Sequence, residues 1–132
     1  MITALNEQAG QQFQTLVQQE LEKGSSYTLA YIQATRTQMN EADVLSTDAS
    51  MLAAIANNRE ALAMWADEYN QFRIKATEEG VPQELASVIR LVCDGIMFAH
   101  LFDLDPPGEE ELTRVVQYLE ALLKKEKDEV ES

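Results

Sequence analysis

Hydrophobic residues recur every three or four positions along most of this chain, which is the spacing of one face of an α-helix. The segment from residue 3 to residue 23 is typical. Phe13, Leu16 and Leu21 share one stripe there, and glutamines occupy much of the remaining surface. No segment alternates between apolar and polar residues over a useful length, so no β-strand is predicted. The pattern therefore predicts an all-α protein.

Six helices are predicted, and their boundaries follow from glycine, proline and capping residues. Gly24 ends the first helix, Gly80 ends the fourth, and the run Pro106-Pro107-Gly108 ends the fifth. The predicted helices span residues 3–23, 26–39, 48–57, 59–79, 82–102 and 109–127. Residues 1–127 are expected to form one helical domain, and the charged residues 128–132 are expected to fray.

The fifth predicted helix differs from the others because it is apolar on nearly every side. Its sequence, LASVIRLVCDGIMFAHLFD, carries only a few polar residues, among them Asp94 and His100. A helix that is apolar all round must be buried all round, and a chain of 132 residues offers few neighbours to bury it. We therefore expect one face to meet the chain's own core and another to meet a second copy of the protein.

The overall charge is strongly negative, with 23 acidic and 10 basic residues and a net charge of −13. Such a surface repels phosphate backbones, so the chain is not expected to bind nucleic acid by itself. The single cysteine, Cys93, excludes an intramolecular disulfide, and the chain starts without a signal peptide, so a cytoplasmic location is expected. Arg90, Asp94 and His100 argue against a membrane span in the apolar helix.

Residue types that support catalysis or metal binding are scarce. With one histidine, one cysteine and no Glu-x-x-His motif, neither a zinc site nor a di-iron site is predicted, and no other cofactor is expected. The chain has no phosphate-binding loop and no nucleophile elbow. His100 is interpreted as a hydrogen-bonded core histidine, and Cys93 as a small core residue rather than a nucleophile. The sequence therefore does not predict an enzyme.

The last two predicted helices resemble those of transcriptional regulators of the tetracycline-repressor (TetR) family. The resemblance rests on LASVIRLVCDGIMFAHLFDLDPPGEEELTRVVQYLEALL, in which an apolar helix carries a central Asp94-Gly95 pair and ends in Leu101-Phe102-Asp103-Leu104. A proline-rich turn and a final helix rich in leucine and valine follow. Upstream, MLAAIANNREALAMWADEYNQFRIKATEEGVPQELA is similar to the family's middle helices, so the resemblance extends from about Leu5 to Leu123.

The resemblance implies an effector-binding and dimerisation domain whose last two helices form a four-helix bundle with a two-fold mate. The helix-turn-helix domain with which the family normally begins has no counterpart here, so DNA contact would require a domain absent from this chain. We interpret the chain as the C-terminal portion of a longer regulator rather than a standalone domain. The predicted interface positions are Val88, Leu91, Gly95, Phe102, Leu112, Val116, Leu119 and Leu123.

An effector pocket in a helical domain is an apolar cavity with a few polar groups. Trp65 and Tyr69 are the leading candidates because they lie four residues apart on one helix face. The methionines and aromatic residues on inward stripes favour a small hydrophobic or amphipathic effector. The predicted ligand-binding residues are Tyr31, Met51, Trp65, Tyr69, Phe72, Asp94, Met97, Phe98 and His100.

A second interpretation stays open at this point. The chain is also consistent with an acidic, all-helical homodimer that binds a protein partner and no small molecule. A filled interior near Trp65 and Tyr69 would favour this interaction module, whereas a cavity there would favour an effector-binding domain.

Overall fold

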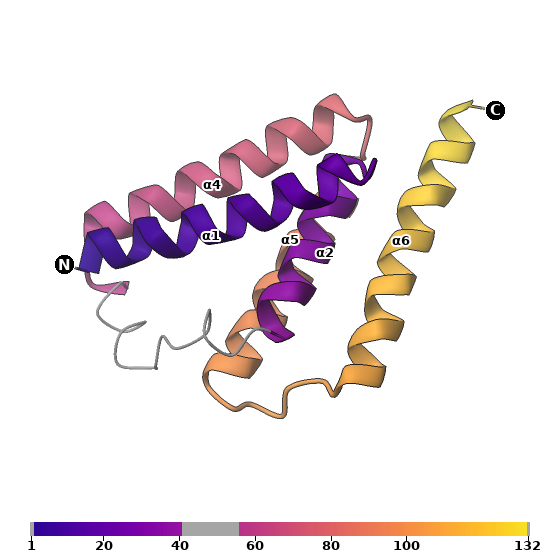
Figure 1. The fold of residues 1–132 in the computed structure, drawn as a ribbon. Coiled ribbons are helices and arrows are strands. Elements are labelled where there is room, and N and C mark those ends of the chain that lie inside the picture. Colours follow the sequence, from indigo (N-terminus) through magenta and orange to yellow (C-terminus); the bar gives the residue numbers. More distant parts are fainter. Residues whose placement is uncertain (1, 41–55, 132) are drawn as a thin grey trace.

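The computed structural model describes the backbone of residues 2–40 and 56–131 and the side chains of residues 10–39 and 56–128. This part of the chain forms five long α-helices (Figure 1). No strand occurs in these ranges, so the predicted all-α class is confirmed. The short helix predicted over residues 48–57 falls almost entirely outside the described residues. The helices are α1 (Ile2–Glu22), α2 (Tyr27–Asn40), α4 (Arg59–Glu78), α5 (Gln83–Leu101) and α6 (Glu109–Glu131).

The helices end at the glycines and caps that the sequence indicates. Gly24 and Gly80 have φ angles of 97° and 83°, in the left-handed region that glycine enters without a steric cost. At the start of α4, the side chain of Asn58 accepts a hydrogen bond from the backbone N–H of Ala61 at 3.1 Å. This bond satisfies one of the donors that the first turn of a helix leaves unpaired.

All five helices contribute buried residues to a common core. α1 packs along α2, and α4 contacts α1, α2 and α5, while α6 packs on α2 and stands on the opposite side of the molecule from α1 and α4 (Figure 1). The centre of the core holds Ile32, Phe72 and Ile89, all fully buried. The ring centroids of Tyr31 and Phe72 are 4.3 Å apart, so the core joins α2, α4 and α5.

The apolar helix α5 is buried on one face only. Ile89 and Cys93 lie in the core, with 0% and 4% of their surface exposed. On the other face, Val88 and Leu91 expose 47% and 62% of theirs. Gly95 and Phe102, the other interface positions predicted on this segment, are also exposed. One subunit therefore leaves part of the apolar surface of α5 uncovered, as the sequence predicts.

The prediction for α6 needs correction. Leu112, Val116 and Leu119 were expected at a dimer interface, but each is only 3% exposed and faces the subunit's own core. Leu123, also expected there, packs at the edge of that core. The reason is that this face of α6 packs against the core shared with α2 and α5. Arg36 Nη2 of α2 also donates a hydrogen bond to Thr113 Oγ1 of α6 at 2.7 Å.

A single carboxylate joins the start of α2 to the end of α4. Oε2 of Glu79 accepts a hydrogen bond from the backbone N–H of Tyr27 at 2.6 Å. Its Oε1 accepts one from the backbone N–H of Thr28 at 3.0 Å and one from the Thr28 hydroxyl at 2.6 Å. Glu79 thus caps the N-terminus of a helix about 50 residues earlier in the chain, where a negative charge is also favoured by the helix dipole.

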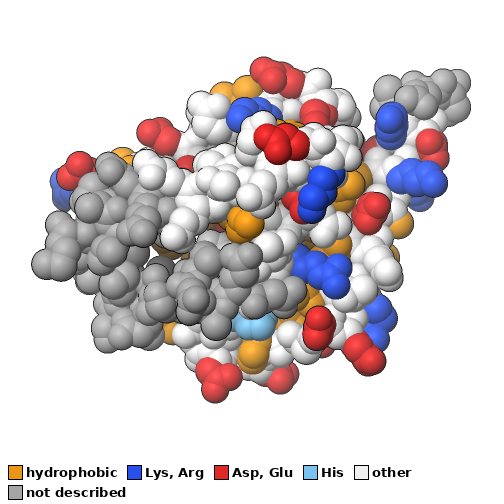
Figure 2. Space-filling view, viewed as in Figure 1, with side chains coloured by type: hydrophobic (Ala, Val, Ile, Leu, Met, Phe, Trp, Pro, Cys, Tyr) orange, Lys and Arg blue, Asp and Glu red, His pale blue; other side chains and the backbone are white. Residues whose placement is uncertain are grey.

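The surface is mixed in charge on the face that Figure 2 shows. Acidic side chains are scattered over it, and basic side chains lie among them, several toward the side of α6. No helix within residues 2–40 and 56–131 is long and apolar enough to cross a membrane.

Candidate functional site

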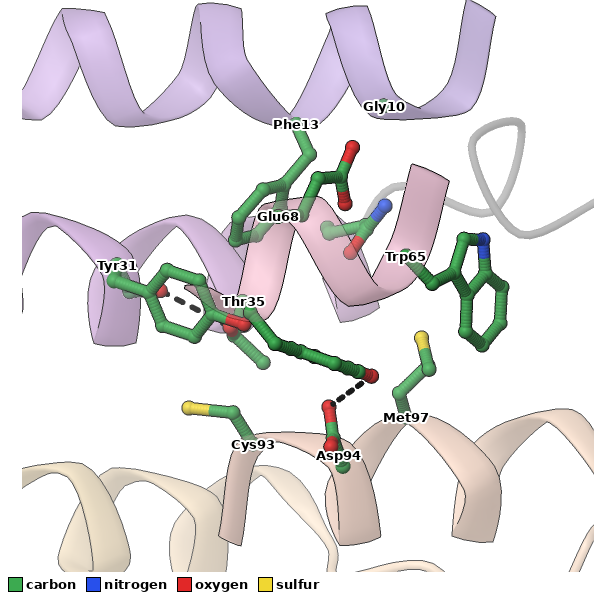
Figure 3. Close-up of a pocket in the computed structure, with 11 residues that line it drawn as sticks. Gly10, Phe13, Tyr31, Thr35, Trp65, Glu68, Cys93, Asp94 and Met97 are labelled. Atoms are coloured by element: carbon green, nitrogen blue, oxygen red, sulfur yellow. Dashed lines mark hydrogen bonds between the residues drawn. The ribbon is translucent and has the colours of Figure 1, made fainter. Parts of the chain in front are cut away.

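A cavity of about 120 Å³ lies among α1, α2, α4 and α5. In Figure 3, Gly10 and Phe13 of α1 are on one side of it, and Cys93, Asp94 and Met97 of α5 are on the opposite side. Aromatic and other apolar groups form most of the wall, and a few polar groups project among them. This composition is typical of small-molecule sites in proteins.

Five of the predicted ligand-binding residues come together in this cavity. They are on three helices and up to 66 positions apart in the sequence: Tyr31, Trp65, Tyr69, Asp94 and Met97. Trp65 and Tyr69 line the same wall because residues four apart share a helix face.

Three of the other predicted residues lie elsewhere. Phe72 is 1% exposed and belongs to the central core. Phe98 does not line the cavity, and its ring lies 6.3 Å from that of Phe102, between centroids. His100 is also outside the lining, and its buried Nε2 has no hydrogen-bond partner in the described part of the chain. The remaining candidate, Met51, falls outside the described residues.

Six lining residues were not predicted from the sequence. Two of them carry a signal that could have found them, since Phe13 lies on the inward stripe of the first helix and Glu68 is three residues after Trp65. The others are brought in by helix packing alone. The six residues are Gly10, Phe13, Thr35, Gln38, Glu68 and Cys93.

Asp94 is held at the cavity by two partners. The Tyr69 hydroxyl donates a hydrogen bond to its Oδ1 at 3.1 Å, and Arg90 Nε lies 3.6 Å from its Oδ2. The Arg90 guanidinium carbon is also 3.8 Å from the centroid of the Tyr69 ring. Burial raises the pKa of Asp94, although both partners favour the charged form. Burial and the nearby Asp94 raise the pKa of Tyr69, so its hydroxyl remains a donor at neutral pH.

Glu68 is the second carboxylate in the lining. Its side chain lies against the backbone of α1, where a Cβ added to Gly10 would be only 2.7 Å from Glu68 Oε1. The absence of a side chain at position 10 therefore makes room for this carboxylate. Neighbouring atoms shield it from water, and this desolvation raises the pKa of Glu68, although the residue as a whole is exposed.

The only cysteine of the chain lies in the cavity lining. Burial raises the pKa of the Cys93 thiol to about 12, so the thiol is protonated at neutral pH and is not an activated nucleophile. No group of three or more potential metal ligands occurs among the described residues.

Glu68→Gln is expected to stabilise the protein at neutral pH and not in acid. The folded state raises the Glu68 pKa above its ordinary value of 4.5, so the ionised carboxylate costs stability once the pH has risen through the folded-state pKa. The amide removes that cost. Thermal unfolding from pH 7 down to about pH 4 should show a gain in Tm that shrinks with acidification.

Asp67→Asn is the matched control, because it removes one charge from the exposed neighbouring position of α4. The shielding of Glu68 would be contradicted if both variants changed Tm equally at every pH.

A shallow apolar groove on the outer surface runs between α5 and α6. Val88 and Val92 of α5 form one wall, and Val115, Tyr118 and Leu122 of α6 belong to the other. Tyr118 is 67% exposed, so the groove continues the uncovered apolar face of α5. The groove and this face of α5 are therefore apolar surface that one subunit leaves uncovered.

The comparison with known proteins agrees with this architecture. The family described as "Tetracyclin repressor-like, C-terminal domain" matches residues 25–124 of the 132 in the chain. No curated protein and no solved structure gives a significant match. The matched range contains α2, α4, α5 and most of α6, and with them all the lining residues of the cavity except Gly10 and Phe13. The chain therefore belongs to the family of tetracycline repressor-like C-terminal domains, which are regulatory domains for ligand binding and dimerisation.

Proposed function

We propose that this chain binds a small hydrophobic or amphipathic effector in the cavity among α1, α2, α4 and α5, and passes the binding event through α1 to a DNA-binding domain outside this chain. The cavity carries the proposal. It has an aromatic wall and two carboxylates, and it is lined by the leading pair of sequence-predicted residues, Trp65 and Tyr69.

The position of α1 supports the relay. Gly10 and Phe13 of α1 line the cavity, and the Phe13 ring packs edge-on against Tyr31 of α2 with 5.1 Å between centroids. A ligand inside the cavity would therefore contact α1 directly. If the ligand binds one position of α1 more tightly than another, it shifts the population toward that position. A coupling of about 1–3 kcal/mol is typical of allosteric proteins.

The alternative, an interaction module without a ligand, has less support. That interpretation needs a filled interior near Trp65 and Tyr69, whereas both residues line a cavity. Family membership also favours a ligand-binding regulatory domain.

We further propose that the uncovered face of α5 and the groove between α5 and α6 are covered by a second copy of the chain. Val88 and Leu91 lie one helical turn apart on the exposed face of α5. Gly95, one turn further along, would allow two helices to approach closely, since nothing lies within 4 Å of a Cβ added there. Two-fold pairing would bury this face against its own equivalent.

A screen that monitors the single tryptophan tests effector binding directly, because Trp65 lines the cavity. Small hydrophobic and amphipathic compounds, neutral and charged, should include some that change its fluorescence saturably and raise Tm. Met97→Trp should fill the cavity and abolish the ligand-induced Tm increase. The proposal fails if no compound binds, or if binding survives in the filled variant.

A further inference from the structure

The charges on the described residues that line the cavity are all of one sign. Among those residues only Glu68 and Asp94 are charged, and none is a lysine, arginine or histidine. The rest of the wall is aromatic, apolar or neutral polar. A neutral apolar ligand would gain nothing from two carboxylates, which cost free energy when they are shielded from water.

The two carboxylates differ in how far their charge is already compensated. Asp94 accepts a hydrogen bond from Tyr69 and lies beside Arg90. Glu68 has no hydrogen bond and no ion pair with any described residue, and its shielded carboxylate is held beside Gly10. Among the described lining residues, Glu68 is therefore the carboxylate whose negative charge has no partner.

Aromatic rings line the same cavity as this carboxylate. Phe13 of α1 lies beside Glu68 in Figure 3, and Trp65 and Tyr69 line the cavity from the same helix as Glu68. Arg90 already lies over the Tyr69 ring with its guanidinium carbon 3.8 Å from the centroid, so that ring accepts a cation in this structure. Ring faces next to a carboxylate are the groups that bind organic cations.

The size of the cavity limits the ligand. Its volume is about 120 Å³, somewhat smaller than the roughly 150 Å³ of an apolar cavity that holds one benzene molecule. The buried part of a ligand is thus about one aromatic ring or a short branched alkyl group. A charged head can extend beyond it toward Glu68.

We infer that, given the proposed effector-binding function, the ligand is an organic cation, with one small apolar group among Trp65, Tyr69 and Met97 and an ammonium or amidinium group paired with Glu68. Asp94, already hydrogen-bonded by Tyr69, contributes a weaker attraction. The excess of acidic residues in the chain as a whole also attracts a cation toward the protein.

Two probes of nearly equal shape separate charge from size. Benzyltrimethylammonium is a cation, and neopentylbenzene is its neutral isostere. Their dissociation constants would be measured by Trp65 fluorescence and calorimetry on the full chain. Glu68→Gln is expected to weaken binding of the cation about fivefold, the upper end for one exposed charge pair, and to change binding of the neutral probe by less than about twofold. Asp67→Asn, on the exposed side of α4, should affect neither probe.

Gly10→Ala tests the same contact without changing any charge. The added methyl would lie 2.7 Å from Glu68 Oε1, so the carboxylate must move. We expect a higher Tm, because alanine is the better helix residue, together with at least about fivefold weaker binding of benzyltrimethylammonium. Gln11→Ala, at the adjacent exposed position, should leave binding of the cation unchanged.

The outcomes distinguish this inference from the proposed function. The cation inference is overturned if Glu68→Gln leaves the affinity for benzyltrimethylammonium unchanged, if it weakens both probes equally, or if the parent chain binds only neopentylbenzene. It is also overturned if neither probe binds while other compounds of the screen do, and in that case the proposed function stands. A screen without any ligand overturns both.

Discussion

Leu91→Glu should give a folded monomer where the parent chain forms a dimer. Leu91 is 62% exposed on the apolar face of α5, next to Val88, which is 47% exposed. In a two-fold dimer built on this face, the new carboxylate would be buried against an apolar surface or against its own equivalent. Such a charge costs several kcal/mol, so the dimer dissociation constant should rise by about 100-fold or more.

Sedimentation equilibrium over a range of concentrations would measure this change. Ile74→Glu is the control, because Ile74 is 41% exposed on α4, away from the α5–α6 groove, and its replacement should leave the dimer intact. Circular dichroism should show equal helix content in all three proteins. If the parent chain is itself a folded monomer at high concentration, a second copy does not cover α5 and the proposed interface is wrong.

Glu79→Ala should lower the free energy of unfolding by about 2–4 kcal/mol, because hydrogen bonds to a charged group are among the stronger ones and their loss leaves buried partners unsatisfied. The substitution removes all three bonds that Tyr27 and Thr28 donate to the carboxylate. Thr28 is 0% exposed, so water cannot replace the lost acceptor without a rearrangement. Urea or guanidinium unfolding would measure the loss as a lower midpoint.

Two further variants test whether the stability loss comes from these hydrogen bonds. Glu78→Ala removes an exposed acidic residue one position earlier and should cost far less. Glu79→Gln keeps one acceptor oxygen, so its loss of unfolding free energy should lie between those of Glu78→Ala and Glu79→Ala. Equal stability losses for Glu78→Ala and Glu79→Ala would show that the junction between α2 and α4 adds nothing to stability.

Helix boundaries were predicted to within about one residue at most described ends. The fourth helix was predicted over 59–79 and spans Arg59–Glu78, and the fifth was predicted over 82–102 and spans Gln83–Leu101. These ends depend on short-range chemistry: Asn58 caps α4, and Gly80 adopts the positive φ that stops it. Such signals act within a few residues of the chain, so they can be read without the tertiary structure.

The cavity was only partly predictable. Trp65 and Tyr69 share a face by helical spacing alone, but Phe72, three residues further on the same stripe, turns into the core. Periodicity identifies which residues point inward. It does not distinguish a position that packs against a neighbour from one that borders an empty space, because that depends on the volume of side chains on other helices.

The shielding of Glu68 was even less predictable from the sequence than the cavity. One acidic residue among 23 is ordinarily part of the solvated surface, and its position three residues after Trp65 indicates only the helix face, not that its carboxylate is shielded from water. Its carboxylate is shielded only because α1 brings Gly10 against it, 58 positions earlier in the chain. Desolvation is set by atoms that are distant in sequence, so it cannot be inferred from spacing.

The sequence by itself determined the all-helical class, the helix boundaries and the presence of more apolar surface on α5 than one subunit covers, because these follow from spacing and composition along a single element. Only the tertiary structure decided which neighbour covers each face. It buried Leu112, Val116 and Leu119 in the subunit's own core, left Leu91 exposed, and brought Glu68 beside Gly10. The physical reason is that burial and charge shielding depend on contacts between distant segments, and one apolar stripe is compatible with several partners.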